Sequence, residues 1–376
     1  MTPLPSLRRV LALTRKESWQ ILRDPVSVAI GVAMPLLMLI LFGYGLSFDI
    51  RHLPVAVVVE HASPESGGIL AALRLSPYFR VHPATSMQEA ERLMTAHEVN
   101  AIVRLPPHFS RDVALGDAAL LVTVNATDAN NARIALNYTR GAIAIWQQKE
   151  LARRSASADS EATVVIENRM WFNEANDSTW FLVPGLIVLV MTLIGALLTS
   201  TVIAREWERG TFEALFATPV RPGEILASKT LPYFVMGMAG LALSVAGSRF
   251  LFGVPLRGSP WLLTLISSLY LLVTLGLGLT ISSLTKSQFL ANQIAFLSTF
   301  LPAFMLSGFM FDIRSMPLWL QGVTHVFPAR YFVSSLQTLF LAGDVWPVLL
   351  PNMAVLAGMA ALLMAMAGKT VRKRIE

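Results

Sequence analysis

The sequence predicts an α-helical polytopic membrane protein with six transmembrane helices and a small α/β extracytoplasmic domain inserted between helices 1 and 2. Three observations lead to this fold class. Only 14% of the 376 residues are charged and 54% are hydrophobic, whereas about 25% are charged in an average soluble domain. Six tracts without Asp, Glu, Lys or Arg approach or exceed the roughly 20 residues that span a bilayer. Between the first two tracts, strand-like and helix-like patterns alternate.

Segment 1–24 precedes the first tract and is basic, yet we do not expect it to be a signal peptide. Its basic residues are spread over a long stretch, and tract 25–48 is longer than the h-region of such a peptide. Tract 25–48 is therefore expected to be transmembrane helix 1. The basic residues of the segment are Arg8, Arg9, Arg15, Lys16 and Arg23.

Segment 49–177 has the pattern of a folded α/β domain. The β-branched run "LPVAVVVE" at 53–60 is typical of a buried strand. Ser86 with Glu89 three residues later predicts the start of a helix over "SMQEAERLMTAHE". A long helix is expected to open at Asp128. Further strands are expected at "VNAIVRL", "ALLVTVN" and "ATVVIENRMWF", and a flexible loop at "RRSASADSEAT".

Region 178–368 holds the other five tracts and is expected to form transmembrane helices 2–6. The third tract of the chain is the shortest. Lys286 alone separates the fourth from the fifth, which predicts a tight helical hairpin. Segment 312–346 carries two apolar amphipathic pieces and is expected to contain a pair of short helices. The five tracts are 178–204, 230–248, 258–285, 287–311 and 345–368.

The distribution of Lys and Arg predicts that both termini are cytoplasmic. Five basic residues precede helix 1, four lie in segment 205–229, Lys286 lies in the hairpin, and four lie in the basic tail 369–376. The short loops assigned to the outside carry only two basic residues each. Positive charge collects on the cytoplasmic side of membrane proteins. We therefore assign the net charge of +6 to this rule and expect no nucleic-acid partner.

Segment 205–225 is dense in charge, although long uncharged tracts flank it. Seven of its 21 residues are charged, and each would cost roughly 2.5–3.5 kcal/mol at the centre of a membrane helix. Helix 2 can extend to Gly210, where glycine favours termination. A short helix then fits 211–217, with Phe212, Leu215 and Phe216 on one face, and Pro219 ends it.

The second half of this loop predicts a new helix. Pro222 suits a first helical position, and Glu224 is favourable in the first turn. The helix can then continue through Lys229 into helix 3. From spacing alone, the loop is equally well explained as an ordinary charged connection that anchors two helix ends.

The loop resembles the cytoplasmic loop of ABC-2 type exporter permeases. "TRKESWQILRDP" is similar to the N-terminal connecting helix of that family, through Lys16, Glu17, Arg23 and Asp24. "LPAFMLSGFMFDIRSMPLWLQ" and "FPARYF" resemble its fifth span and the segment that follows. The large domain between helices 1 and 2 is similar to the bacterial drug-efflux subgroup. The matching loop residues are Arg205, Glu206, Glu208, Gly210, Thr211, Glu213, Leu215, Pro219, Glu224 and Lys229.

This resemblance implies a function. The 211–217 helix would be the coupling helix that docks on a separate ABC ATP-binding subunit, with its apolar face buried and Glu206, Glu208 and Glu213 paired with basic groups there or locally. ATP and Mg²⁺ would then be bound by the partner, and this chain would hold no cofactor or metal. The resemblance also implies a dimer with a second or sister permease, a bacterial inner-membrane location, an outer-leaflet re-entrant segment at 312–346, and efflux of drugs or other amphiphiles beside a periplasmic membrane fusion adaptor.

Other functions are disfavoured by the sequence. It has no G-x-x-x-x-G-K-[ST], H-E-x-x-H or G-x-S-x-G motif, so we expect no catalytic site. Ion-coupled transporters use ionisable groups within the membrane, and the six tracts have no Asp or Glu. A membrane-anchored sensor or adaptor, whose outside domain binds a ligand, remains the alternative. For segment 312–346, interfacial helices remain the alternative to a re-entrant pair.

Overall fold

The computed structural model describes residues 4–45, 52–115, 118–125, 129–156, 178–211 and 220–370. The chain forms two compact units. One is a helical unit, Met1–Ser47 with Met170–Glu376, and the other is an α/β unit, Phe48–Arg169.

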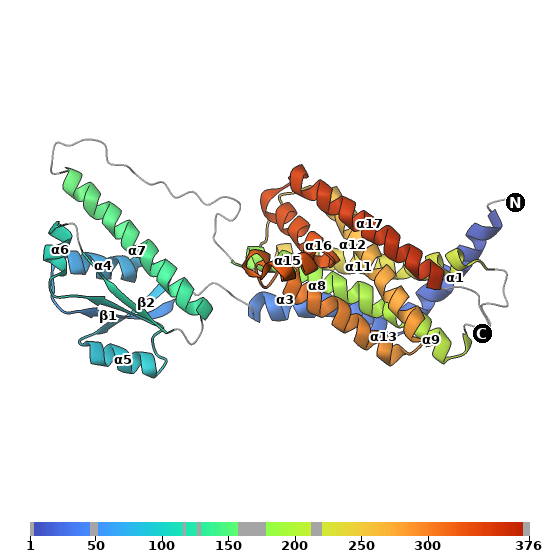
Figure 1. Cartoon of the computed structure of the whole chain (residues 1–376), viewed down its shortest axis with the longest axis horizontal. Helices are drawn as coiled ribbons and strands as arrows, with labels where there is room; N and C mark the ends of the chain where they lie inside the picture. The colour runs from blue at the N-terminus through green and yellow to red at the C-terminus, as the bar shows by residue number, and fades with distance from the viewer. Residues whose placement is uncertain are drawn as a thin grey trace. The chain divides into compact units, whose positions relative to one another are not determined.

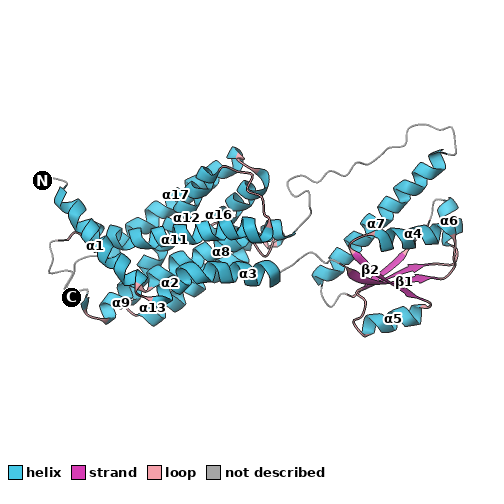
Figure 2. Ribbon diagram, turned by 180° about the vertical axis from the view of Figure 1, so that it is seen from behind, coloured by secondary structure: helices cyan, strands magenta, loops and turns pink. Residues whose placement is uncertain are grey.

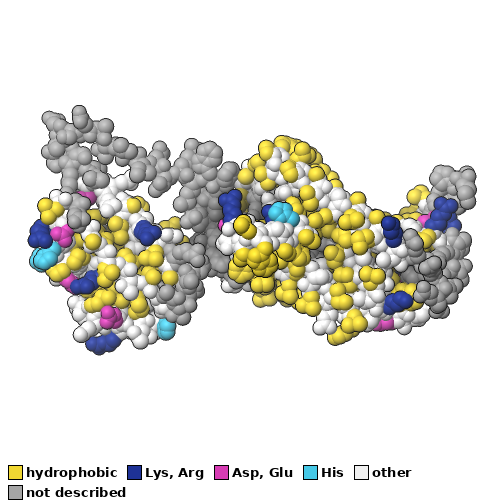
Figure 3. Space-filling view, viewed as in Figure 1, with side chains coloured by type: hydrophobic (Ala, Val, Ile, Leu, Met, Phe, Trp, Pro, Cys, Tyr) yellow, Lys and Arg dark blue, Asp and Glu magenta, His cyan; other side chains and the backbone are white. Residues whose placement is uncertain are grey.

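The helical unit contains six helices that are long and apolar enough to cross a membrane, judged by length and composition within the described residues. This number agrees with the sequence prediction, and the chain is a multi-pass membrane protein. Hydrophobic side chains cover most of the flank of the unit, and Lys and Arg lie toward its ends (Figure 3). The candidate spans are Pro25–Gly45, Ser178–Glu208, Pro222–Phe252, Pro260–Thr285, Gln288–Leu306 and Trp346–Thr370.

Helix α8 (Ser178–Ser200) forms the centre of the helical unit, and nearly every residue after Phe181 is buried. It packs against α3 (Met34–Gly45), α11 (Pro222–Phe252), α12 (Pro260–Thr285) and α16 (Pro328–Gln337), as Figure 1 shows. Gly278 of α12 brings the two backbones together. A Cβ at this position would lie only 2.6 Å from the carbonyl oxygen of Ala196, so glycine permits this close packing.

The second span is interrupted near its end. Helix α8 stops at Ser200, and α9 (Val202–Glu208) begins after a turn at Thr201. The side-chain oxygen of Ser282 in α12 accepts hydrogen bonds from the N–H groups of Ile203 (3.0 Å) and Ala204 (2.9 Å). Helix α12 therefore provides the first turn of α9 with acceptors for its unpaired backbone donors.

The third span agrees with the predicted helix that begins at Pro222 and continues through Lys229, and it is among the longest spans although its charge-free tract is the shortest. Helix α11 runs through 31 residues and includes Glu224, Lys229 and Arg249. The helix extends beyond its charge-free tract because Glu224 and Lys229 are paired with side chains of neighbouring helices, and Arg249 lies in the last turn. The shortest candidate span is the fifth, Gln288–Leu306, with 19 residues.

The hairpin between the fourth and fifth spans agrees with the prediction. Helix α12 ends at Thr285, Lys286 has a positive φ of 54°, and α13 (Gln288–Ala295) begins two residues later. Two spans contain π-helical turns, η1 (Ala29–Ala33) after α2 (Pro25–Val28), and η2 (Phe296–Phe300) before α14 (Leu301–Leu306).

The segment after the fifth span forms the expected pair of short helices. These are α15 (Leu318–Thr324) and α16, preceded by η3 (Ile313–Ser315) and followed by η4 (Thr338–Ala342). Helix α17 (Trp346–Thr370) forms the sixth span. Its last residue accepts a hydrogen bond from Ser283 at the end of α12 (2.7 Å).

The α/β unit is built on a four-stranded sheet with the order β2-β1-β3-β4. Strand β1 is parallel to β2 and β3, and β4 is antiparallel to β3. Helices α4 and α7 cover one face and α5 covers the other (Figure 2). The elements are β1 (Leu53–Val59), α4 (Pro64–Leu75), β2 (Phe79–Ala84), α5 (Met87–Thr95), β3 (Ala101–Leu105), α6 (Phe109–Leu115), β4 (Leu121–Val124) and α7 (Ala129–Ala156).

The alternation of side chains along β1 explains why both faces carry helices. Val55 and Val57 are buried under α4 and α7, whereas Ala56 and Val58 are buried under α5. This agrees with the expectation of a buried strand at 53–60.

Other expectations for this unit had mixed outcomes. Ser86 caps α5 as predicted, because its hydroxyl accepts a hydrogen bond from the Glu89 N–H (3.3 Å). Residues 153–156 of the expected loop are helical, because α7 continues to Ala156, and the rest of that loop lies outside the described residues. The expected opening of α7 at Asp128 and the strand over 162–172 lie outside the described residues.

Candidate functional site

The site is built around α9, at the end of the helical unit where α1 (Leu4–Leu22), α13 and the end of α17 also lie (Figure 2). Three of its side chains, Arg205, Glu206 and Glu208, contact neighbouring helices. Helix α9 contains the first residues of segment 205–229 and α11 contains its last residues, so the contacts of these two helices fix both ends of the segment.

Glu206 lies in a buried ion cluster with Lys16, Glu17 and Lys229. One oxygen of Glu206, Oε1, lies 2.9 Å from Lys229 Nζ and 3.3 Å from Lys16 Nζ. The Oε1 atom of Glu17 lies 3.2 Å from Lys229 Nζ and 3.0 Å from Lys16 Nζ. Two carboxylates thus share two ammonium groups, and α1, α9 and α11 meet at this point.

Burial makes this ion cluster sensitive to the loss of Glu17, Glu206 or Lys229. Glu17, Glu206 and Lys229 are only 4%, 5% and 2% exposed. A buried ion pair contributes little net stability, but removing one partner leaves an uncompensated charge and costs several kcal/mol. The second oxygen of Glu206, Oε2, is buried and accepts no hydrogen bond from the described residues. Among the described residues, the negative charge of Glu206 is therefore compensated by Lys16 and Lys229.

The pKa values of the α1 members reflect this pairing. Burial by itself raises the pKa of Glu17, but the nearby Lys229 and Lys16 outweigh it and hold the pKa below its ordinary value. Burial lowers the pKa of Lys16, but Glu17 and Glu206 outweigh that effect, so this pKa is raised. Both groups are therefore charged near neutral pH.

Arg205 joins α9 to the first and fifth spans. Its Nη1 lies 3.2 Å from Asp24 Oδ2, and its Nε donates to the side-chain oxygen of Gln288 (3.2 Å). Asp24 is also the N-cap of α2, since its other oxygen accepts from the Val26 N–H (3.2 Å). Burial raises the pKa of Asp24, but Ser27, Arg205 and this backbone bond outweigh it and lower the pKa.

Glu208 attaches α9 to the start of α13. Its Oε1 accepts a hydrogen bond from the Gln288 N–H (2.8 Å), and its Oε2 accepts one from the Gln288 side chain. A carboxylate is favourable at this position, because the first N–H groups of a helix are unpaired and carry partial positive charge. Next to it, Lys286 Nζ lies 4.6 Å from the centre of the Trp207 ring.

The start of α11 is fixed in the same way. The Oε2 of Glu224 accepts a hydrogen bond from the Arg221 N–H (2.9 Å), and its Oε1 lies 3.4 Å from Arg9 Nη2. Pro222 occupies the first turn, as the sequence predicted. Helix α1 is thus paired with both α9 and α11.

The structure brings together seven of the residues singled out in the sequence. Lys16, Glu17, Asp24, Arg205, Glu206, Glu224 and Lys229 all belong to this network, and Glu208 lies beside it. Gly210 has the positive φ (66°) expected where a helix stops, and Thr211 is exposed.

Other predicted residues lie elsewhere. Arg23 is not in the network, because its guanidinium lies over the Trp19 ring at 5.6 Å. The remaining predicted residues are outside the described part of the chain. They are Phe212, Glu213, Leu215, Phe216 and Pro219.

Sequence reasoning missed Arg9, Gln288 and Ser282, which complete the contacts of α1 and α9. Gln288 and Ser282 belong to the α12–α13 hairpin, more than 70 residues beyond α9 in the chain. No spacing rule within a single segment could reveal these pairings.

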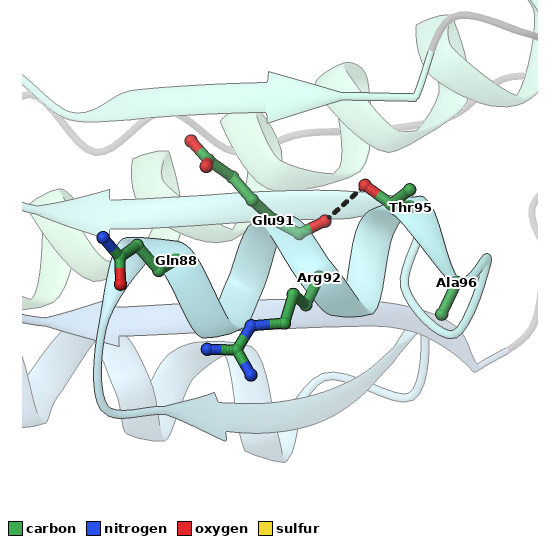
Figure 4. Close-up of a pocket in the computed structure, with 5 residues that line it drawn as sticks. All are labelled: Gln88, Glu91, Arg92, Thr95 and Ala96. Carbon is green, nitrogen blue, oxygen red and sulfur yellow. Dashed lines mark hydrogen bonds between the residues drawn. The ribbon is translucent and has the colours of Figure 1, made fainter.

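The α/β unit has a groove, but polar side chains from different elements do not meet in it. A groove of about 750 Å³ runs along the outer face of α5 (Figure 4). Its lining side chains all come from one helix, and the hydroxyl of Thr95 bonds the backbone oxygen of Glu91 (2.8 Å). The candidate site is therefore the network around α9. The groove is lined by Gln88, Glu91, Arg92, Thr95 and Ala96.

Comparison with known proteins gives consistent matches over the whole chain. A family model described as "ABC-2 family transporter protein" matches residues 26–369. The chain is 40% identical over 376 residues to the "Probable multidrug ABC transporter permease YbhS" of Escherichia coli (strain K12), covering 100% of this chain and 99% of that protein.

Two further relatives are more distant. "Probable multidrug ABC transporter permease YbhR" of the same bacterium is 29% identical over 354 residues, covering 91% of this chain and 94% of the relative. "Linearmycin resistance permease protein LnrN" of Bacillus subtilis (strain 168) is 23% identical over 390 residues, covering 97% of this chain and 100% of the relative.

Proposed function

The chain belongs to the ABC-2 family of transporter proteins, and from this premise we propose that it is the permease subunit of an ATP-driven exporter that couples to a separate ATP-binding subunit through the 205–229 loop. The observation that supports this most directly is the ion cluster. It pairs α1 with α9 and α11, the two helices that contain the ends of this loop.

The network supplies a physical route for coupling. A subunit that pulls on the loop acts on α9 and α11 together, because Lys229 of α11 is paired with Glu206 of α9 at 2.9 Å. Arg205 and Glu208 connect the same displacement to the starts of the first and fifth spans through Asp24 and Gln288. In this proposal α9 is a lever, and the turn at Thr201 is its hinge.

The docking surface itself would be the 211–217 helix. Phe212, Leu215 and Phe216 would be buried against the ATP-binding subunit, and Glu213 would pair with a basic group there. Such an interface has an apolar centre and a polar rim. Glu206 would act indirectly, since it is 5% exposed and already paired with two lysines.

The rest of the complex follows from the same proposal. ATP and Mg²⁺ would be bound by the partner subunit, and two permeases would enclose the translocation path. Both termini would be cytoplasmic in the bacterial inner membrane, with 49–177 as a periplasmic α/β domain able to contact a membrane fusion adaptor and 312–346 as a re-entrant pair. The relatives described as multidrug permeases favour drugs or other amphiphiles as substrates.

The test is to co-express the chain with its ATP-binding subunit and to measure both capture of that subunit and substrate-stimulated ATP hydrolysis. Phe212→Ala and Leu215→Ala should each weaken capture about thirtyfold, because truncating an interface anchor costs about 2 kcal/mol. Glu213→Lys should reduce both readouts. Phe250→Ala is a matched control, since Phe250 is 83% exposed on α11 and outside the loop.

One result of this experiment would contradict the proposal. If the three loop variants insert normally and then bind and stimulate like Phe250→Ala, the loop does not dock the ATPase. The membrane topology is checked separately by single cysteines in the cysteine-free chain. An impermeant reagent should label position 63 in intact spheroplasts but not position 6, and the reverse pattern would contradict the orientation.

A further inference from the structure

The outward face of α1 and the start of the first span carry basic and apolar side chains that the network does not use. Arg8, Arg15 and Arg23 are exposed and have no carboxylate within ion-pair distance among the described residues. Trp19 and Leu22, between them, are 53% and 69% exposed. Cationic groups beside large exposed apolar side chains are typical of helices that contact a membrane surface.

A hollow of about 400 Å³ begins at Arg23 and continues along the first span. It lies over the π-helical turn η1, where the small side chains of Ala29 and Ala33 leave room beside Val28 and Val32. Its wall beyond Arg23 is entirely apolar. Besides Leu22 and Arg23, the lining residues are Pro25, Val28, Ala29, Val32 and Ala33.

The charge of Arg23 is available to a ligand. The adjacent carboxylate, Asp24, does not neutralise it, because its oxygens accept from Ser27 (2.8 Å), Val26 N–H (3.2 Å) and Arg205 (3.2 Å). The guanidinium of Arg23 lies over Trp19 instead, an arrangement that leaves its N–H groups able to bind an anion.

We propose that this hollow is a binding site for one anionic phospholipid, whose phosphate group binds Arg23 and one of whose acyl chains lies along Val28, Ala29 and Val32. The charge and the groove shape are complementary to this class of molecule, since a cationic group stands at the head of an apolar channel on a membrane span. Arg15, two turns earlier on the outward face of α1, extends the basic surface for neighbouring headgroups.

The site adjoins the proposed lever without being part of it. Asp24, next to Arg23, holds Arg205 of α9 at 3.2 Å. A bound lipid would therefore restrict the start of the first span beside this pair, and loss of the lipid would leave the network itself intact.

The experiment is a native mass spectrometry titration of the purified full-length protein in detergent, with dioleoyl phosphatidylglycerol against dioleoyl phosphatidylcholine. Arg23→Ala should weaken phosphatidylglycerol binding about fivefold, because each basic residue at an anionic surface contributes about 1 kcal/mol. Arg249→Ala is the control, since it removes one exposed arginine from another span. Ala29→Leu fills the hollow without changing charge and should also weaken binding.

Three outcomes would overturn the proposal. Equal effects of Arg23→Ala and Arg249→Ala would indicate only general attraction to charge. An unchanged affinity in Ala29→Leu would exclude the hollow as the place of the acyl chain. Competition by glycerol phosphate as effective as that by phosphatidylglycerol would assign the site to a soluble phosphate. Arg23→Lys, which keeps the charge, should retain most of the affinity, and size-exclusion profiles check that each variant is folded.

Discussion

Replacing Lys229 by methionine is the most informative single change in the ion cluster. Its Nζ lies 2.9 Å from Glu206 and 3.2 Å from Glu17, and the residue is 2% exposed. Methionine keeps a long flexible side chain and removes the charge. The cluster then holds two carboxylates and one ammonium, that of Lys16, whose side chain is 52% exposed.

The expected loss of unfolding free energy in Lys229→Met follows from this geometry. Removing one partner of a buried pair costs about 3–5 kcal/mol, and because Lys16 still compensates one carboxylate we expect the lower figure, about 3 kcal/mol. Adding Glu206→Gln to Lys229→Met leaves one Lys and one Glu and restores neutrality. The double variant should therefore recover a large part of the lost stability, with a coupling energy of about 1–3 kcal/mol.

The assay is the free energy of unfolding of the detergent-solubilised protein in a denaturant titration. Lys369→Met is the matched control, since Lys369 is exposed at the end of α17. The reasoning is refuted if Lys229→Met is no less stable than Lys369→Met, or if Glu206→Gln adds a further loss to the Lys229→Met background.

Three other predictions concern stability. Folding lowers the pKa of Glu17 below its ordinary value of 4.5, so the stability that this carboxylate contributes is present above that pH and is lost as the pH falls through the lower folded value. Glu17→Gln should therefore flatten the decrease in melting temperature as the pH falls below that ordinary value. Gly278→Ala places a Cβ 2.6 Å from a backbone oxygen of α8 and should cost about 1–3 kcal/mol. Gly358→Ala in α17 has open space around it and should not destabilise the protein, because alanine favours a helix over glycine. Ser282→Ala leaves two buried N–H donors of α9 unpaired and should cost about 1–3 kcal/mol by the same denaturant titration, and a neutral result would contradict its capping role.

Much of the helical architecture could be predicted from charge and helix-terminating residues. The spans are visible because charged side chains are costly in lipid, and Lys286 alone was enough to predict the hairpin. The start of α11 at Pro222 and its continuation through Lys229 agree with the prediction, but the partners of Lys229 could not be predicted. Lys229 lies within the helix because Glu17 and Glu206 compensate its charge, and those partners belong to other helices.

In the α/β unit, strand β2 shows where pattern reasoning fails. Its sequence, "FRVHPA", has no clear alternation and contains Pro83. Proline lacks the N–H that a central strand must donate, and it is tolerated at an edge. Because β2 is an edge strand of the sheet, the proline fits, but only the tertiary arrangement reveals this. Helices α4 and α6 were also not predicted.

The members of the candidate site could be singled out, but their pairings could not. Lys16, Glu17, Glu206 and Lys229 were marked by resemblance to a family, and nothing in the sequence indicated that Glu206 lies between the two lysines. Separations of 190 residues (Lys16 to Glu206) and 212 residues (Glu17 to Lys229) are beyond any local rule.

These same separations have a consequence for biosynthesis. At about 5–20 residues per second, a ribosome that has made Glu17 needs about 10 to 40 s to reach Lys229, 212 residues later. During that interval the carboxylate of Glu17 has Lys16 beside it but lacks its buried partner. The cluster can close only after α11 has been made, so a nascent chain that stalls before α11 leaves Glu17 and Glu206 without the ammonium group of Lys229.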